Sequence, residues 1–157
     1  MASAEKRRNI AVLIAKNFKK INVSLPKLKK LVKFTCNRFK LSKAAISIAI
    51  VGDAKIRKVN KKFLRKDHPT DCISFDLSES KKNSIKSFEL VVNGEMAVRY
   101  AKLLGHSGEA ELALYITHGL LHNLGFDDSA KNQAEKMHNI EDQILQQIGF
   151  GHVYKKA

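Results

Sequence analysis

The sequence predicts an α/β (α+β) fold, a small mixed β-sheet of about four strands packed by about five helices. Apolar runs of strand length alternate with longer segments of helical periodicity along the chain. Two of these runs are separated only by a polar tip, which favours an antiparallel pair inside the sheet. The chain has 157 residues, no internal repeat and no Pro/Gly-rich linker. We therefore expect a single domain over residues 1–157, with mobile ends at 1–8 and 150–157.

The first half of the chain contains two predicted strands and two predicted helices. Residues 9–15 are a strand or a short apolar helix, because periodicity cannot decide for so short a run. A serine and a first-turn proline then begin a lysine-rich amphipathic helix over 26–40. The Ile- and Val-rich run 45–52 predicts a buried strand. Asp53 after it can cap a helix through residues 54–64.

The second half predicts the antiparallel pair and three helices. Residues 71–77 and 88–94 are the paired strands on either side of the polar tip. A helix over 95–104 follows the second strand. The segment 108–124 has leucines all round, which predicts a buried helix, and a last helix runs from about 129 to 148.

The chain is strongly basic. It has 29 Lys plus Arg against 15 Asp plus Glu, a formal net charge of +14. Residues 1–40 carry 12 basic groups and one acid, so about +11 of this charge lies in the first quarter. A solvated basic face would need no partner, but an excess over the whole chain favours a polyanionic one, RNA or DNA.

The cysteines and apolar runs bear on the cellular compartment. Cys36 and Cys72 form no CxxC pattern, which indicates free thiols in a reducing compartment. The apolar run 10–15 is too short for a signal-peptide core or a membrane span. We therefore expect a cytoplasmic protein without a membrane partner.

The segment HGLLHNLGFDD at 118–128 contains the candidate site. Helical spacing places Glu111, Tyr115, His118 and His122 on one stripe of a helix that is otherwise apolar. Buried polar groups must find partners, and a divalent cation would satisfy both imidazoles at once. The alternative is a buried helix with two incidental histidines and a solvated turn.

The residues after the histidines favour the metal site. Gly125 can end the helix in the left-handed conformation, so that Asp127 or Asp128 approaches His118 and His122. Two imidazoles and a carboxylate leave an open position on a tetrahedral Zn²⁺ ion, as in catalytic zinc sites. Gly119 stands where HExxH metalloproteases have their glutamate, which disfavours a peptidase.

Several blocks of the chain resemble the YbeY family, which are metal-dependent endoribonucleases. HGLLHNLGFDD is similar to the family motif HGxLHLxGYDH. Further blocks resemble the family in the same order, and the similarity covers roughly residues 45–148. They are NKKFLRKDHPTDCISF (60–75), NGEMAV (93–98) and GHSGEAEL (105–112).

The resemblance implies a single-strand-specific endoribonuclease that matures the 3′ end of 16S rRNA and acts in ribosome quality control. Its expected partners are precursor rRNA and the ribosome or ribosomal proteins, and its cofactor is one Zn²⁺ ion per chain. Three expected ligands are His118, His122 and Asp128, of which the two histidines also act in catalysis with Arg65. The expected RNA-binding residues are Arg65, Lys66, Lys29, Lys30 and Lys33.

Three positions depart from the family pattern. Asp128 replaces the family's third histidine, and aspartate is a competent zinc ligand that can shift metal preference. Leu64 replaces an arginine, so either Arg65 takes over its task or activity is weakened. Glu95 replaces an aspartate, which keeps the charge on a longer side chain.

Other residues have two interpretations each. Glu111 either accepts a hydrogen bond from a ligand histidine or is a paired charge. Ser74 packs in its strand or, as the resemblance implies, supports the cleft, and His106 is expected to cap a helix or bond the backbone. Phe34 and Phe63 have helical spacing to apolar neighbours, which predicts core positions rather than base-stacking platforms.

Two other functions compete with the nuclease. A non-catalytic RNA- or ribosome-binding factor could keep the basic surface without the metal, in keeping with Leu64 and Asp128. A metal-dependent hydrolase of another substrate is disfavoured by the net charge of +14.

Overall fold

The computed structural model describes residues 8–81, 84–151 and 153, so the expected mobility of 1–7, 152 and 154–157 lies outside the described residues. Four strands and five helices form one α/β domain, as predicted, and the strand alternative holds for the first element. The elements are β1 (Asn9–Lys16), α1 (Leu25–Arg38), β2 (Lys43–Val51), α2 (Asp53–Leu64), β3 (Cys72–Asp76), β4 (Lys86–Asn93), α3 (Gly94–Leu104), α4 (Gly108–Asn123) and α5 (Lys131–Gln147).

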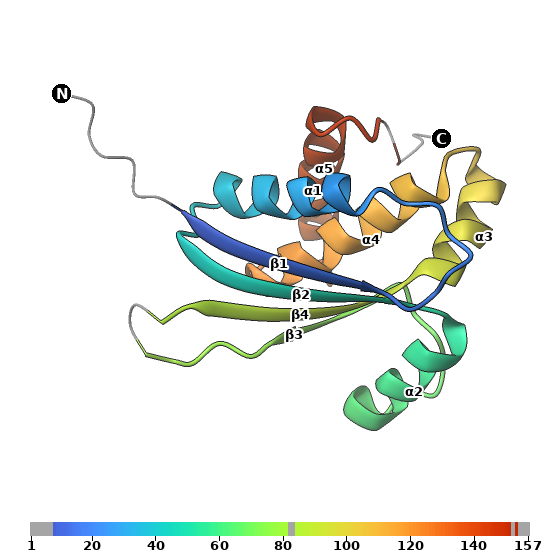
Figure 1. The fold of residues 1–157 in the computed structure, drawn as a ribbon, viewed down its shortest axis with the longest axis horizontal. Helices are drawn as coiled ribbons and strands as arrows, with labels where there is room; N and C mark the ends of the chain where they lie inside the picture. Colours follow the sequence, from blue (N-terminus) through green and yellow to red (C-terminus); the bar gives the residue numbers. More distant parts are fainter. Residues whose placement is uncertain (1–7, 82–83, 152, 154–157) are drawn as a thin grey trace.

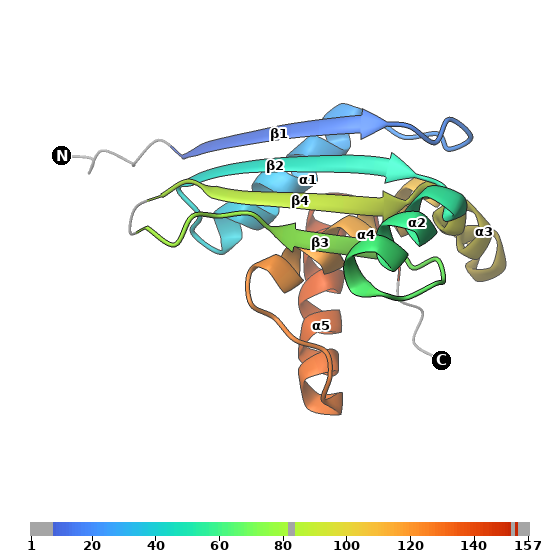
Figure 2. The same ribbon diagram turned by 90° about the horizontal axis from the view of Figure 1, so that it is seen from below.

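The four strands form one mixed sheet in the order β1-β2-β4-β3. β1, β2 and β4 are parallel, and β3 runs antiparallel to β4, which confirms the predicted pair (Figure 2). Along β2 buried and exposed residues alternate at first, because one face of the sheet is covered along its whole length. The last residues of β2 are buried on both sides.

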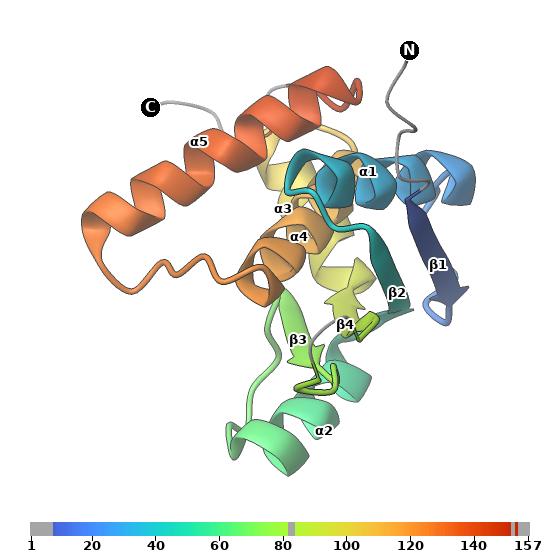
Figure 3. The ribbon, with the colours of Figure 1, turned by 90° about the vertical axis from the view of Figure 1, so that its left-hand side faces the viewer.

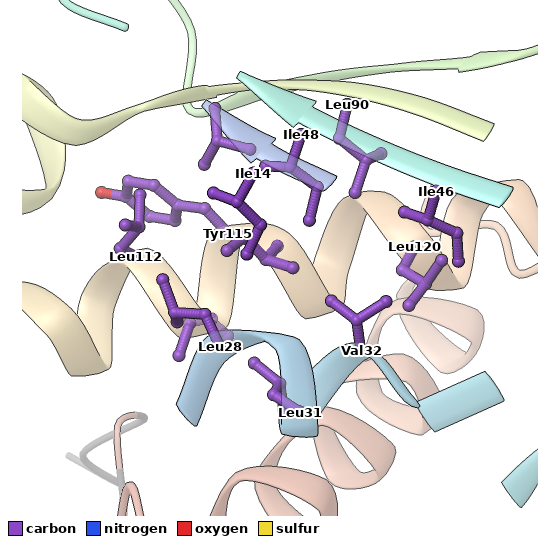
Figure 4. Close-up of a cluster of buried hydrophobic side chains, with 14 of the residues drawn as sticks. Ile14, Leu28, Leu31, Val32, Ile46, Ile48, Leu90, Leu112, Tyr115 and Leu120 are labelled. Atoms are coloured by element: carbon purple, nitrogen blue, oxygen red, sulfur yellow. The ribbon is translucent and has the colours of Figure 1, made fainter. Parts of the chain in front are cut away.

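Helices cover the two faces of the sheet unequally. α1, α4 and α5 lie on one side, whereas α2 lies on the other (Figure 1). The main core is between the sheet and the first group, and Figure 4 shows side chains of β1, β2 and β4 packed against α1 and α4. Labelled members of this core are Ile14, Leu28, Leu31, Val32, Ile46, Ile48, Leu90, Leu112, Tyr115 and Leu120.

α4 is the central helix of the fold, and a glycine sets its distance from β3. A Cβ placed on Gly119 would lie 2.5 Å from Sγ of Cys72 and 3.2 Å from Cδ2 of Leu90. The helix can therefore approach the sheet this closely only because residue 119 has no side chain. The absence of a metalloprotease glutamate at this position thus has a packing reason.

α2 differs from the prediction in two respects. Gly52, and not Asp53, is its N-cap; Asp53 is the first helical residue and binds Arg99 and Asn93 through its carboxylate. The prediction that Phe63 is a core residue is wrong, because 57% of its surface is exposed. The helix packs on a small second cluster near its start, and its last turn extends beyond that cluster.

Two residues of the segment 150–157, which we expected to be mobile, pack against the fold. Phe150 is packed against the main core, and Val153 is buried. Phe34 is half-buried against the same core, as predicted, and Cys36 and Cys72 are free cysteines. Among the described residues, no helix combines the length and the apolar character needed to cross a membrane.

Candidate metal centre

Two histidines of α4 face each other at the C-terminal end of the helix. His118 and His122 are one turn apart, and their Nε2 atoms are separated by 3.1 Å. Oδ2 of Asp128 lies 3.4 Å from Nε2 of His118 and 3.6 Å from Nε2 of His122. The predicted trio is therefore gathered around one point, where each residue offers one donor atom to a cation.

The turn after α4 returns the chain to the histidines. Gly125 has a φ of 98°, the left-handed conformation predicted for this residue. The amide N–H of Gly125 donates to the carbonyl of His122, and that of Phe126 donates to the carbonyl of Leu121. These bonds reverse the chain directly after the last helical turn, so that Asp128 reaches the histidines.

The structure distinguishes between the two aspartates of the turn. Asp127 accepts hydrogen bonds from the backbone N–H and the hydroxyl of Ser129, and these bonds hold the pKa of its carboxyl below the usual range. Asp127 therefore stabilises the turn. Asp128 is the residue whose carboxylate lies beside the histidines.

Both histidines are held through their other ring nitrogen. Nδ1 of His118 lies 3.2 Å from Oε1 of Glu141 on α5, and Nδ1 of His122 lies 3.0 Å from the carbonyl oxygen of Phe126. A carbonyl can only accept, so Nδ1 of His122 is the donor, and its Nε2 then has a free lone pair in the neutral ring. An ionised Glu141 has the same effect on His118. The two lone pairs would face each other, an arrangement that a shared cation stabilises.

The electrostatic surroundings also favour a cation. Burial disfavours the protonated form of His118, but its pKa is raised above the usual value because the hydrogen bond and charge of Glu141 outweigh burial. The charges of Asp71 and Asp128 act in the same direction. Three carboxylates from separate segments of the chain thus act on the imidazole of His118.

The sequence analysis missed Glu141. Its side chain is completely buried in the chain's interior, and it contacts a histidine 23 positions earlier in the sequence. The sequence does contain a signal for it. Glu141 lies in the apolar stripe of α5 between Met137 and Ile144, where a carboxylate needs a partner.

Glu111 pairs with His106 and not with His118 or His122 in the described part of the chain. Its Oε2 lies 2.5 Å from Nε2 of His106. Burial is the main reason why the pKa of Tyr115 is raised, and the negative charge of Glu111 adds to this effect. Glu111 shares a stripe with His118, but seven residues correspond to roughly 10 Å along a helix axis. The alternative of a paired group is therefore correct for Glu111, and His106 bonds a side chain rather than the backbone.

The other expected site residues lie on β3, at the end of α2 and on α1. Ser74 of β3 lies opposite Leu90 of β4. In the described part of the chain, no hydrogen bond joins Ser74 to the histidines. Arg65 is exposed at the end of α2 with a φ of 56°, and Lys66 follows it. Their connection leads to the start of β3 beside α4 (Figure 3), and the charge of Asp71, which precedes β3, contributes to the raised pKa of His118. The three lysines expected to bind RNA, Lys29, Lys30 and Lys33, lie on α1.

Comparisons with known proteins identify the family of the chain. A family model described as endoribonuclease YbeY matches residues 13–149, which begins earlier than the similarity seen in the motifs. A relative named endoribonuclease YbeY from Aquifex aeolicus is 32% identical over 147 residues, covering 93% of this chain and 97% of the relative. One of the same name from Carboxydothermus hydrogenoformans is 36% identical over 105 residues, covering 67% of this chain and 73% of the relative.

A solved structure supports the fold. The solution structure of a protein from Thermotoga maritima superimposes with a TM-score of 0.57 at 22% identity. The match covers 88% of this chain and 90% of that protein.

Proposed function

Because the chain belongs to the YbeY family of endoribonucleases, we propose that it cleaves single-stranded RNA at a metal ion held by His118, His122 and Asp128. One observation supports the choice of these three residues. Two imidazole nitrogens and a carboxylate oxygen, from a helix and the turn after it, converge on one point. The relatives' shared name supports RNA phosphodiester bonds as the substrate.

We propose zinc as the ion. Zinc takes nitrogen and oxygen ligands at about 2.0–2.2 Å, which places the ligand atoms of a tetrahedral site roughly 3.3 Å apart. The distances between the three donor atoms are 3.1, 3.4 and 3.6 Å, close to that requirement. The donor set therefore fits the ion with little rearrangement.

The chain's own residues hold and orient the ion. A zinc ion bound there would supply a Lewis acid for a phosphodiester oxygen and lower the pKa of a bound water. Glu141 and the carbonyl of Phe126 fix the two rings with Nε2 toward the centre. Asp128 is the most exposed of the three ligands, so the substrate would approach from its side.

Arg65 and Lys66 are proposed to bind the phosphates next to the scissile bond. Both are exposed, and neither makes a salt bridge in the described part of the chain. Leu64 stands where the family pattern has arginine and is itself half-exposed. Because Arg65 is the next residue and its side chain is exposed, it can take over that role.

The lysines of α1 would bind RNA further from the cut. α1 packs against β1, whereas α4 packs against β3 and β4, so these lysines lie over the other half of the sheet (Figure 3). Lys29, Lys30 and Lys33 can therefore add a sequence-independent attraction for the backbone of a longer RNA. A long, structured RNA such as precursor rRNA on the ribosome is the partner that we propose for so basic a protein.

A histidine substitution tests the function. His118→Ala is expected to abolish metal binding and cleavage of a single-stranded RNA while the fold is kept, because His118 supplies one of the three donor atoms. His138→Ala, which removes an exposed histidine of α5, is the matched control and should cleave like the parent. Full cleavage by His118→Ala would overturn the assignment, and RNA binding without cleavage in the parent protein would favour a non-catalytic factor.

A further inference from the structure

Phe63, at the end of α2, is an exposed aromatic ring that packs against one aromatic neighbour. More than half of its surface is accessible. The ring of Phe63 and the ring of Phe75 on β3 form a T-shaped pair, with ring centroids 5.4 Å apart at an angle of 72°. Phe75 itself packs against the small cluster under α2, so the contact ties the exposed ring to the body of the fold. The accessible surface of Phe63 is therefore available to a flat partner such as a base.

The helix that carries this ring is strongly basic. Residues 55–66 contain seven Lys and Arg and no acid. Asp67 pairs with two of them, Arg57 and Lys61. In the described part of the chain the other five make no salt bridge, and Lys62 lies 5.3 Å from the centre of the Phe63 ring. They are Lys55, Lys58, Lys62, Arg65 and Lys66. Such an unbalanced set attracts a polyanion to the end of α2.

The ring also lies close enough to the metal centre to act on the same substrate. The chain passes from Arg65 to Cys72, and Sγ of Cys72 lies against Gly119, the residue after His118. Seven residues span at most about 25 Å even when fully extended. Figure 3 shows this connection running from α2 to the start of β3 beside α4. A few nucleotides of single-stranded RNA could bridge the two places.

We propose that Phe63 is a stacking platform for a base of the single-stranded RNA substrate, with Lys62, Arg65 and Lys66 holding the adjacent phosphates. An aromatic face for a base and flanking cations for the backbone are the two components of sequence-tolerant single-strand recognition. The proposal rests on the proposed function, because it names how that substrate is held. It also gives a physical reason for single-strand preference, since bases inside a duplex cannot reach the ring.

Substitutions of Phe63 test the platform in the full-length, metal-loaded protein. The probe is a labelled 2′-O-methyl RNA oligomer of about eight nucleotides, whose affinity is measured by fluorescence anisotropy. Phe63→Ala is expected to raise its Kd by roughly 5- to 100-fold, which corresponds to the loss of one stacked base. Phe63→Tyr keeps the ring and should stay within about twofold of the parent, whereas Phe63→Leu keeps apolar area only and should resemble alanine.

Salt dependence separates stacking from charge. Stacking releases no counterions, so Phe63→Ala should leave the slope of log Kd against log salt unchanged. Arg65→Ala should instead reduce that slope by about one. A duplex of the same length should bind Phe63→Ala and the parent equally, and Tyr100→Ala, which removes an exposed aromatic ring on α3, should leave single-strand binding unchanged.

The possible results distinguish a failure of the Phe63 platform from a failure of the proposed nuclease function. If the parent cleaves unmodified single-stranded RNA but Phe63→Ala or Phe63→Leu binds the oligomer as the parent does, the platform is wrong and the nuclease remains. If the parent neither binds nor cleaves single-stranded RNA, the proposed function fails and the platform with it. An equal loss for duplex and single strand would show that Phe63 does not contact bases, and would assign the exposed ring to another partner such as a protein.

Discussion

Nδ1 of His118 lies 3.2 Å from Oε1 of Glu141, a carboxylate that is completely buried. The two residues come from different helices, α4 and α5, so this contact couples helix packing to the orientation of the imidazole. With Nδ1 engaged, Nε2 of His118 faces Nε2 of His122 and Asp128. A carboxylate behind a ligand histidine orients the ring and raises its basicity, and both effects strengthen metal binding.

Loss of the charge on Glu141 should weaken metal binding. Glu141→Gln preserves the size of the side chain, and we expect the dissociation constant for zinc to rise by roughly 10- to 100-fold. Competition against a chelating dye measures it. Glu135→Gln, at an exposed position of the same helix, is the matched control. Equal affinities in the two variants would remove the positioning role of Glu141.

The close approach of α4 to β3 predicts a coupled pair of substitutions. Gly119→Ala should destabilise the protein by about 1–3 kcal/mol, because its Cβ would meet Sγ of Cys72. Cys72→Ala removes that atom, so the double variant should recover part of the loss. Gly108→Ala is the control, since a Cβ there would meet only ordinary contacts at 3.5 Å and beyond. Urea unfolding gives the free energies, and strictly additive losses would contradict the predicted clash.

Asp53 should contribute stability that depends on pH. The hydrogen bond from Arg99, supported by one from Asn93, holds the pKa of its carboxyl below the usual value against the effect of burial. The contribution is therefore present above the ordinary aspartate pKa of about 3.9 and is lost as the pH falls through the lowered value. We expect Asp53→Asn to cost about 1 kcal/mol or less at pH 7, because Arg99 is half exposed and solvent screens the pair.

Unfolding of Asp53→Asn and the parent at several pH values checks this prediction. The difference in unfolding free energy should shrink toward zero in acid. A difference that is the same at pH 7 and at acidic pH would show that the carboxylate charge does not stabilise the fold.

Local patterns in the sequence predict most of the elements and the grouping of the three candidate ligands. His118, His122, Gly125 and Asp128 lie within 11 residues, so helix periodicity and one turn determine how they meet. Glu141 belongs to another helix, and only tertiary packing brings it to His118. The sequence could show that a carboxylate interrupted an apolar stripe, but not which residue it would contact.

The exposure of Phe63 also depends on tertiary packing that the sequence pattern does not show. Its spacing to Val59 is helical and apolar, but burial depends on how far the sheet extends beneath the helix. The position of the basic residues in space is likewise set by the fold. The sequence directs attention to the first 40 residues, whereas the structure places a second group of cations on α2, at the start of the connection that leads to the metal centre.

Metal content tests the central claim most directly. Elemental mass spectrometry would be applied to the parent, Asp128→Asn and Asp127→Asn, purified without chelator and without affinity-tag histidines. We expect about one zinc per chain in the parent and in Asp127→Asn, and its loss in Asp128→Asn, because Asp128 lies beside the histidines whereas Asp127 bonds Ser129. Well-folded parent protein that contains no metal and takes none up, or equal metal in all three proteins, would contradict a centre built from His118, His122 and Asp128.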